Sequence, residues 1–558
     1  MNEKKRITLL LAVTVLVYAN TLFNGFTMDD DPYILHNTAV TSPSWHGFFL
    51  PNQVTNLFRP ITIGSFALNW AIGGDHPFGY HLVNVLLNAI VALLLYLVLR
   101  KLLENVASGG VVAWAAALLF ALHPIHTESV ASIVGRSELL AAAFLLGAWL
   151  LHLEDRPYLA LLCFLLALLS KESAVVFVPL VFAGDSAQGK LRSIRRYAGI
   201  AVVGGAYLVV LRRIQGGHYG ANRIAFLDNP LAYLPASLRI LNALRIAWKY
   251  VALQVYPATL SCDYSYNSIL LYANWHRTAP AVIATLLVLA LWIWAFWTKK
   301  KEWFLAGAIY LIAFSVTSNL LTATGTIMAE RLAYLPSAGF CLGVALIWIC
   351  LEKRQRTAAW TVLGIVLLAL AARTVVRNRD WRDNFTLVTA GERAVPGSAK
   401  MHAGVGDQYL VRGQLEEARR ELKFALHIYP DYPQAIGLLG LAEARLGNDQ
   451  EALSLFQKQL AMTPKDDFQY ATIQVNLAAQ LSKLRQNAAA AKILDDVIAK
   501  SPDNARAWSN RAAIQFQRGD YQAARSDAET SLRLDPANPQ AQSVLALLAG
   551  RSTPIPQP

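Results

Sequence analysis

The chain has 558 residues, of which 55% are hydrophobic and only 16% charged, and its mean hydropathy is +0.35. Soluble domains carry about 25% charged residues, so this composition argues against a wholly soluble protein. The net charge of +13 belongs almost entirely to residues 1–397, because residues 398–558 contain 18 Lys and Arg and 17 Asp and Glu. Excess positive charge in an apolar region favours a membrane protein with basic cytoplasmic loops over a nucleic-acid binder. The four cysteines show neither a disulfide framework nor a zinc-ligand spacing.

Apolar runs that can form membrane-spanning helices fill the first two thirds of the chain. A span needs about 20 residues as a helix, although several of these runs are shorter. The first run follows Lys4–Arg6, as in a signal peptide, but no small-residue cleavage site comes after it, so we interpret it as an uncleaved span. We expect about eleven spans, near 7–24, 82–100, 111–123, 137–153, 157–170, 174–184, 197–214, 279–298, 303–318, 333–351 and 357–373.

The basic loops predict the orientation, because Lys and Arg concentrate on the cytoplasmic side. They fall on one side only if residues 237–256 do not span. That segment carries Arg239, Arg245 and Lys249 among apolar residues, so we interpret it as an amphipathic helix at the membrane interface. The N-terminus is then cytoplasmic, the C-terminal part extracytoplasmic, and the extracytoplasmic loops are 25–81, 215–278 and 319–332.

Three carboxylates, Asp29, Asp30 and Asp31, follow the first predicted span. They fit a solvated loop, or alternatively a general base or metal ligand held at the membrane face. One carboxylate raises the pKa of its neighbour, which helps one of them to accept a proton near neutral pH.

Other polar groups interrupt apolar sequence, where ionisable residues are often functional. His123-Pro-Ile-His126 with nearby Glu128 offers zinc ligands, but Pro124 breaks the helix that would place both histidines on one face. Lys171-Glu172 and Glu330-Arg331 fit either functional groups or self-compensating helix ends. A cluster after the last span fits binding of a lipid phosphate or contact with bulk lipid, and consists of Arg373, Arg377, Arg379 and Arg382.

Prolines recur in the last third of the chain at intervals of 34, 34, 38 and 34 residues, from Pro396 to Pro536. A 34-residue period is the tetratricopeptide signature. We expect four helical pairs and a capping helix at 538–549, forming a peptide- or protein-binding groove or a spacer. Small residues recur where the paired helices touch, at Gly406, Gly440, Ala478 and Ala512 and at Ala418, Ala452, Ala490 and Ala524. The turns contain Gly413, Gly447 and Gly519, with Arg485 in the third repeat.

Taken together, these motifs resemble the transmembrane and tetratricopeptide-repeat-containing O-mannosyltransferases, which are glycosyltransferases of the GT-C class. The resemblance runs from about residue 20 into the repeats. It rests on Asp29-Asp30, Phe58-Arg59-Pro60, His123-Pro-Ile-His126-Thr-Glu128, Gly135-Arg136-Ser-Glu138, Ser170-Lys171-Glu172, Asp228-Asn229-Pro230, Leu260-Ser261-Cys-Asp263-Tyr264, Met328-Ala-Glu330-Arg331 and Arg379-Asp380-Trp381.

The resemblance implies an all-α fold, with a polytopic GT-C-type helix bundle followed by a tetratricopeptide-repeat solenoid. The bundle would occupy residues 1–375, a linker 376–397, the repeats 398–549 and a tail 550–558. The compact loops and the short Lys-rich N-terminus favour a bacterial member in the inner (plasma) membrane, with periplasmic repeats and undecaprenyl phosphate as carrier.

The implied activity is an inverting transfer of one sugar, mannose or another hexose, from a polyprenyl-phosphate carrier to Ser or Thr hydroxyls of an extracytoplasmic protein. The repeats would bind the acceptor protein. We assign catalysis to Asp29 and Asp30 and donor-phosphate binding to Arg59, Lys171 and Arg331. Supporting polar roles are expected for His126, Glu128, Arg136, Glu138, Glu172, Asp263 and Glu330.

We predict no metal ligands and no cofactor, because the donor has one phosphate instead of two. Binding of a divalent cation is left open. Two alternatives remain at this point. One is a membrane-anchored scaffold whose repeats recruit envelope proteins. The other is a ligase or flippase for lipid-linked oligosaccharides.

Overall fold

The computed structural model describes residues 1–45, 47–50, 57–214, 224–467 and 469–551. Every regular element within these ranges is helical, which confirms the all-α prediction. The chain divides into two compact units, Met1–Ser398 and Ala399–Pro558. Parts of the predicted loops 25–81 and 215–278 and nearly all of the predicted tail 550–558 lie outside the described residues.

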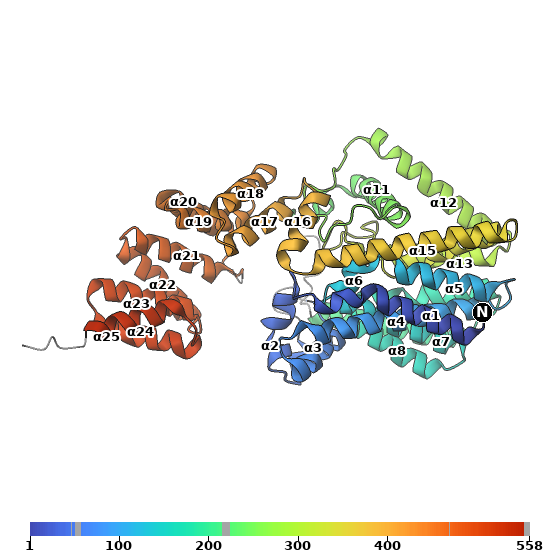
Figure 1. Ribbon diagram of the computed structural model, residues 1–558, viewed down its shortest axis with the longest axis horizontal. Helices are drawn as coiled ribbons and strands as arrows, with labels where there is room; N and C mark the ends of the chain where they lie inside the picture. Colours follow the sequence, from blue (N-terminus) through green and yellow to red (C-terminus); the bar gives the residue numbers. More distant parts are fainter. Residues whose placement is uncertain (46, 51–56, 215–223, 468, 552–558) are drawn as a thin grey trace, which may run out of the picture. The chain divides into compact units, whose positions relative to one another are not determined.

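The apolar runs of the first unit fold as the helices labelled in Figure 1. Their bounds are α1 (Glu3–Tyr18), α3 (Pro60–Gly73), α4 (Pro77–Leu102), α5 (Gly109–Leu122), α6 (Thr127–Ala131), α7 (Arg136–Leu153), α8 (Pro157–Ser170), α9 (Phe177–Gln188), α10 (Ile194–Ile214), α11 (Ala236–Val255), α12 (Ala279–Trp297), α13 (Lys301–Ser315), α14 (Ser337–Glu352), α15 (Arg356–Asn378) and α16 (Asn384–Ala394). A four-residue helix, α2 (Thr38–Thr41), lies in the first loop.

Six helices of the described chain are long and apolar enough to cross a membrane, namely α1, α4, α7, α10, α12 and α15 with their short extensions. A seventh span is possible if α5 and α6, which meet at a bend of 53°, count as one. The helices α8 and α14 are apolar but shorter. The count of eleven spans therefore stays a prediction. The helix α11 is not among these candidate spans, and its position at the membrane interface stays a prediction.

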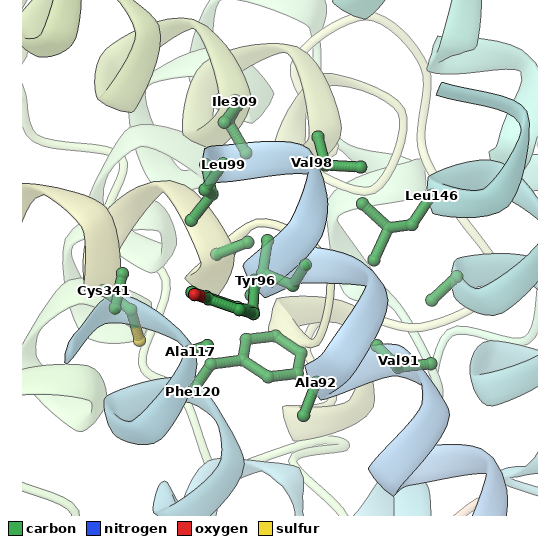
Figure 2. Close-up of a cluster of buried hydrophobic side chains, with 14 of the residues drawn as sticks. Val91, Ala92, Tyr96, Val98, Leu99, Ala117, Phe120, Leu146, Ile309 and Cys341 are labelled. Carbon is green, nitrogen blue, oxygen red and sulfur yellow. The ribbon is translucent and has the colours of Figure 1, made fainter. Parts of the chain in front are cut away.

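The core of the first unit lies around α4, which packs against α1, α5 and α7. Figure 2 shows Tyr96 of α4 between Phe120 of α5 and Cys341 of α14. The side chains of Ala115, Ala116 and Ala117 on α5 are fully buried. Small residues allow helices to approach closely, which is how apolar helices associate where no hydrophobic driving force acts between them.

Residues 376–397, the predicted linker, are largely helical. They contain the end of α15, a 3-10 turn at Arg379–Trp381 and α16, and they belong to the first unit. Asp383 and Thr386 form a reciprocal capping box that begins α16. Asn378 Nδ2 donates hydrogen bonds to the Val17 carbonyl at 2.9 Å and to Asn20 Oδ1 at 2.8 Å. Polar side chains thus attach this segment to the end of α1, a contact that the local sequence does not reveal, and the boundary between bundle and linker stays a prediction.

The second unit contains the four predicted helical pairs and the capping helix. The pairs are α17 (Ala399–Val411) with α18 (Leu415–Ile428), α19 (Pro433–Leu446) with α20 (Asp449–Met462), α21 (Tyr470–Lys483) with α22 (Asn487–Lys500), and α23 (Ala505–Arg518) with α24 (Tyr521–Leu534), followed by α25 (Pro539–Arg551).

The small residues of the repeats lie where the sequence period predicts close contact. Ala418, Ala452 and Ala490 are fully buried. A Cβ atom added to Gly440 would lie 2.8 Å from the Phe456 ring, closer than carbon atoms normally approach. The small residues are therefore required by packing.

Candidate active site

The two predicted catalytic aspartates have opposite environments. Asp29 is exposed, and no hydrogen bond to its carboxylate is found within the described part of the chain. Asp30 is fully buried. Its Oδ2 accepts the backbone N–H of Thr27 at 2.8 Å, and its Oδ1 accepts the backbone N–H of Val134 at 3.0 Å. Asp29 can therefore reach a substrate, whereas Asp30 holds the loop against the start of α7.

Burial raises the pKa of Asp30 to about 7, and the neighbouring Asp29 carboxylate adds to this effect, while the backbone N–H groups of Thr27 and Val134 oppose it. A buried carboxyl group is harder to ionise because the low-dielectric interior replaces its hydration. The sequence predicts that one carboxylate raises the pKa of its neighbour, and the group whose pKa is raised is the buried one, Asp30.

Three ion pairs bring together six of the predicted site residues. Arg59 precedes α3 and binds Glu172 through two parallel hydrogen bonds of 3.1 and 2.8 Å. Lys171 follows α8 and donates to Glu138 in the first turn of α7. Each pair joins different elements of the chain, and every member lies at or near the end of a helix.

The third pair joins Arg331 to Glu128 on α6. Glu128 is buried, and its Oε2 also accepts the backbone N–H of Arg331 at 2.8 Å. The pKa of Arg331 is raised chiefly by Glu128, against the effect of burial, with further contributions from Asp29 and Glu138. Asp29 is linked to this region through its neighbour Asp30, which accepts the Val134 N–H just before α7, the helix that carries Glu138.

The cations of the three pairs differ in their access to a ligand. The Arg331 side chain is 37% exposed, against 16% for Arg59 and 7% for Lys171. Only one guanidinium nitrogen of Arg331 has a hydrogen-bond partner among the described residues. Its remaining N–H groups are therefore available to an anion, and the planar guanidinium suits a phosphate.

Glu330 and Arg331 do not pair with each other, although they are adjacent. Glu330 is fully buried and accepts hydrogen bonds from the Ser261 backbone N–H at 2.6 Å and from the Tyr264 hydroxyl at 2.7 Å. Its Oε2 lies 3.8 Å from Nη2 of Arg377. Burial raises the pKa of Glu330 to about 7, and Arg377 opposes this shift. Glu330 thus attaches the 261–264 segment to the end of α15.

The arginines after the last span include two with internal partners. Arg377 is buried and pairs with Asp380 at 2.9 Å as well as with Glu330. Arg373 donates to the carbonyls of Pro257 and Ala258 at 3.1 and 3.0 Å. The interpretation of these two as lipid-phosphate ligands is not supported, because their guanidinium groups already bind protein oxygens.

Two further predicted residues serve the fold. Arg136 is fully buried and donates to Asn84 Oδ1, Asn69 Oδ1 and the Tyr80 carbonyl at 2.9, 2.6 and 2.8 Å, so it joins α3, α4 and α7. Asp263 accepts the Ser265 backbone N–H at 2.9 Å and stabilises a local turn. Neither Arg136 nor Asp263 makes an ion pair with a member of the three pairs described above.

The histidine pair does not form a zinc site. His123 uses both ring nitrogens in hydrogen bonds, to the Gln254 carbonyl at 2.8 Å and to the Ile125 backbone N–H at 3.2 Å. His126 Nε2 bonds the Ser337 hydroxyl at 2.7 Å. His126 therefore joins the turn after α5 to the start of α14, and its supporting role at the site stays a prediction.

Three polar side chains near the candidate site were not among the predicted site residues. Ser137 lies 3.5 Å from Nη1 of Arg59, and Lys249 of α11 lies 4.9 Å above the ring of Tyr264. Asn84 Nδ2 donates to the Ser132 carbonyl at 3.0 Å and so supports the turn before α7. An amide within the apolar run of α4 was the one available signal for Asn84.

Comparison with known proteins agrees with this architecture. Residues 406–467 and 476–539 match the tetratricopeptide repeat family. A protein O-mannosyl-transferase of Caenorhabditis elegans is 30% identical over 450 residues, covering 77% of this chain and 64% of that protein. Protein O-mannosyl-transferase TMTC3 of Mus musculus is 28% identical over 513 residues, covering 83% of this chain and 55% of that protein. The predicted resemblance is confirmed.

The similarity to the protein O-mannosyl-transferases includes the membrane unit, because the matched lengths exceed the repeat unit several-fold. The chain spans less than two thirds of the length of either relative. Among solved structures, MamA from Desulfovibrio magneticus RS-1 is 26% identical, and the match covers 27% of this chain and 84% of that chain with a TM-score of 0.24. No structural conclusion follows at that score.

Proposed function

We propose that this protein is a multi-pass membrane glycosyltransferase that moves one mannosyl residue from a polyprenyl-phosphate carrier to a Ser or Thr hydroxyl of an extracytoplasmic protein. The observation that carries the proposal is the exposed Asp29 carboxylate next to Asp30, which bonds the segment just before α7, together with the exposed guanidinium group of Arg331. The names of the relatives support mannose and a protein acceptor. The apolar helices support a membrane setting.

In the proposed reaction, Asp29 accepts the proton of the acceptor hydroxyl as its oxygen attacks the anomeric carbon. The bond from that carbon to the phosphate oxygen breaks, and the polyprenyl phosphate leaves with one additional negative charge. A single displacement inverts the anomeric configuration. A positioned general base contributes about 10²–10⁴-fold to such a step.

Arg331 is the best candidate to stabilise the leaving phosphate. It combines the greatest exposure of the three paired cations with unpaired N–H groups. Fixed donors in a site shielded from water stabilise developing charge strongly, because they need no reorganisation. Arg59 binds Glu172 through two hydrogen bonds and Lys171 is more deeply buried, so we assign both an electrostatic supporting role.

We further propose that the site faces the extracytoplasmic side of the plasma membrane and that the repeats bind the acceptor protein. The basic loops support this orientation, since Lys and Arg concentrate on the cytoplasmic side. The tetratricopeptide match supports the binding role.

The direct test is mannose transfer by purified full-length protein supplied with mannosyl polyprenyl phosphate and a Ser- or Thr-containing acceptor. Asp29→Asn should lower turnover by at least about 100-fold, because the amide cannot accept the proton. The matched control is Asp31→Asn, since Asp31 is also exposed and its carboxylate bonds only the His36 ring, at 2.8 Å, among the described residues. Wild-type turnover in Asp29→Asn would reject the proposed chemistry.

A further inference from the structure

The loop that carries Asp29 is attached to the end of the last long helix by a series of hydrogen bonds. Asn20 Nδ2 donates to the Val375 carbonyl at 2.9 Å, and Asn24 Nδ2 donates to the Asn378 carbonyl at 3.1 Å. The Gly25 backbone N–H donates to the Arg382 carbonyl at 2.8 Å. From Asn20 to Gly25, each of these bonds lies closer to Asp29 along the sequence.

The last bond of this series is made by Asn384. Its Oδ1 accepts the backbone N–H of Met28 at 2.7 Å. Met28 has a φ of +44°, in the left-handed region that side chains other than Gly rarely adopt. Such a conformation persists only where the surroundings enforce it, and it often occurs at functional sites.

Asn384 is itself held in place. It is the first residue of α16, directly after Asp383, whose carboxylate accepts the Thr386 backbone N–H at 2.8 Å. Asp30 fixes the other side of Asp29 through Thr27 and Val134. The exposed Asp29 therefore lies between two anchored residues.

We propose that Asn384 is a positioning residue for Asp29. By binding the Met28 N–H, it holds the 27–30 turn in the conformation that directs the Asp29 carboxylate to the acceptor hydroxyl. This inference rests on the proposed function, because it takes Asp29 as the base. A misplacement of about 1 Å at a reacting group can reduce the rate by about 100-fold.

The test compares Asn384→Ala with Asn20→Ala in the full-length protein, using mannosyl polyprenyl phosphate and a Ser-containing peptide. Asn384→Ala should lower kcat by about 10–100-fold while KM for the donor and the melting temperature stay near wild-type values. Asn20→Ala removes bonds farther from Asp29, so it should lower the melting temperature with kcat within about threefold of wild type.

Two rescue variants separate positioning from a purely structural role. Asn384→Asp keeps an oxygen acceptor and should restore most of kcat. Met28→Gly in the Asn384→Ala background should restore kcat at least threefold, because Gly adopts a positive φ without strain. Failure of both rescues would overturn the positioning role, as would a wild-type kcat in Asn384→Ala.

The two proposals fail in distinguishable ways. If Asp29→Asn remains fully active, the proposed function fails whatever Asn384 does. If Asp29→Asn is inactive while Asn384→Ala keeps its kcat, only the positioning role fails.

Discussion

Asp29 and Asp30 are adjacent residues of the same type, but they differ in their exposure to solvent. Asp29 is exposed, whereas Asp30 has lost its hydration and accepts backbone hydrogen bonds on both oxygens. A similar contrast distinguishes Arg331 from Lys171, since both pair with a glutamate but the Arg331 side chain is exposed whereas the Lys171 side chain is buried. Residue type alone therefore does not determine which member of each set acts on substrate.

The phosphate-binding role of Arg331 can be tested by Arg331→Lys. The lysine keeps the positive charge opposite Glu128 but loses the forked N–H donors, so we expect turnover to fall at least about 10-fold with the fold retained. Arg354→Lys, at an exposed position in the turn before α15, is the matched control. Turnover and melting temperature should be measured together, and unchanged turnover in Arg331→Lys would contradict the role.

Asp30 predicts a pH dependence of stability. Its pKa is raised to about 7 in the folded protein, whereas an unfolded aspartate titrates near pH 4. The unfolded chain therefore releases this proton first, and the contribution to folded stability is lost as pH rises from about 4 to 7. One pKa unit corresponds to about 1.4 kcal/mol, so the contribution is on the order of 4 kcal/mol at most.

The measurement is the melting temperature of wild type and Asp30→Asn across that pH range. The asparagine cannot ionise, so the melting temperature of wild type should fall relative to that of Asp30→Asn between pH 4 and 7, whichever is more stable at a single pH. Asp31→Asn serves as the control, and its curve should follow wild type. Parallel curves for wild type and Asp30→Asn would contradict the raised pKa.

At the scale of elements, the repeat turns show how one conformation is made by different residues. Gly413, Gly447 and Gly519 end their helices at φ values of +72°, +87° and +85°, and Arg485 takes the same place at +61°. Glycine adopts this region freely, whereas other L-residues are strained there by about 1–2 kcal/mol. The sequence already shows that Arg485 replaces the glycine of the other repeats, and the turn has the same left-handed conformation despite this replacement.

Arg485→Gly should therefore stabilise the repeat unit, by about 0.5–1 kcal/mol after the greater chain entropy of glycine is subtracted. The reverse comparison, Gly447→Ala, should destabilise it by about 1 kcal/mol. Chemical unfolding of residues 399–551 would measure both changes. A loss of stability in Arg485→Gly would show that the arginine side chain makes a compensating contact.

The elements around the candidate site are each short and irregular. Pro124 interrupts the α5–α6 run, and the turn at Glu330–Ala333 presents Arg331. Sequence periodicity identifies the apolar helices on either side but gives little information about such turns. The Arg59–Glu172, Lys171–Glu138 and Arg331–Glu128 pairings therefore could not be predicted from spacing, even though all six residues were expected to matter.

At the scale of the whole molecule, the two units have separate hydrophobic cores, one around α4 and others within the repeats. Truncation after Ser398 should therefore leave a folded membrane unit that mannosylates a short peptide within about threefold of the full-length rate. The kcat/KM for an acceptor protein that the repeats bind should fall at least 10-fold, because tethering raises the effective concentration of acceptor at the site.

The full-length protein and the truncated chain would be compared with both acceptors in parallel. Equal kcat/KM values for the acceptor protein would show that the repeats do not contribute to its binding. Loss of peptide transfer on truncation would show instead that the membrane unit needs the repeats for its own stability.

The sequence by itself determined the features that depend on neighbouring residues: apolar helices, the 34-residue repeat with its small packing positions, and the polar residues that interrupt apolar runs. These follow from helical periodicity and from the energetic penalty of burying charge. Tertiary structure alone decided which aspartate is exposed, which cation each glutamate neutralises, and that residues 376–397 attach to the end of α1. Burial and pairing depend on groups distant in the sequence, from 33 residues apart in the Lys171–Glu138 pair to 203 in the Arg331–Glu128 pair, and their geometry exists only once the chain has folded.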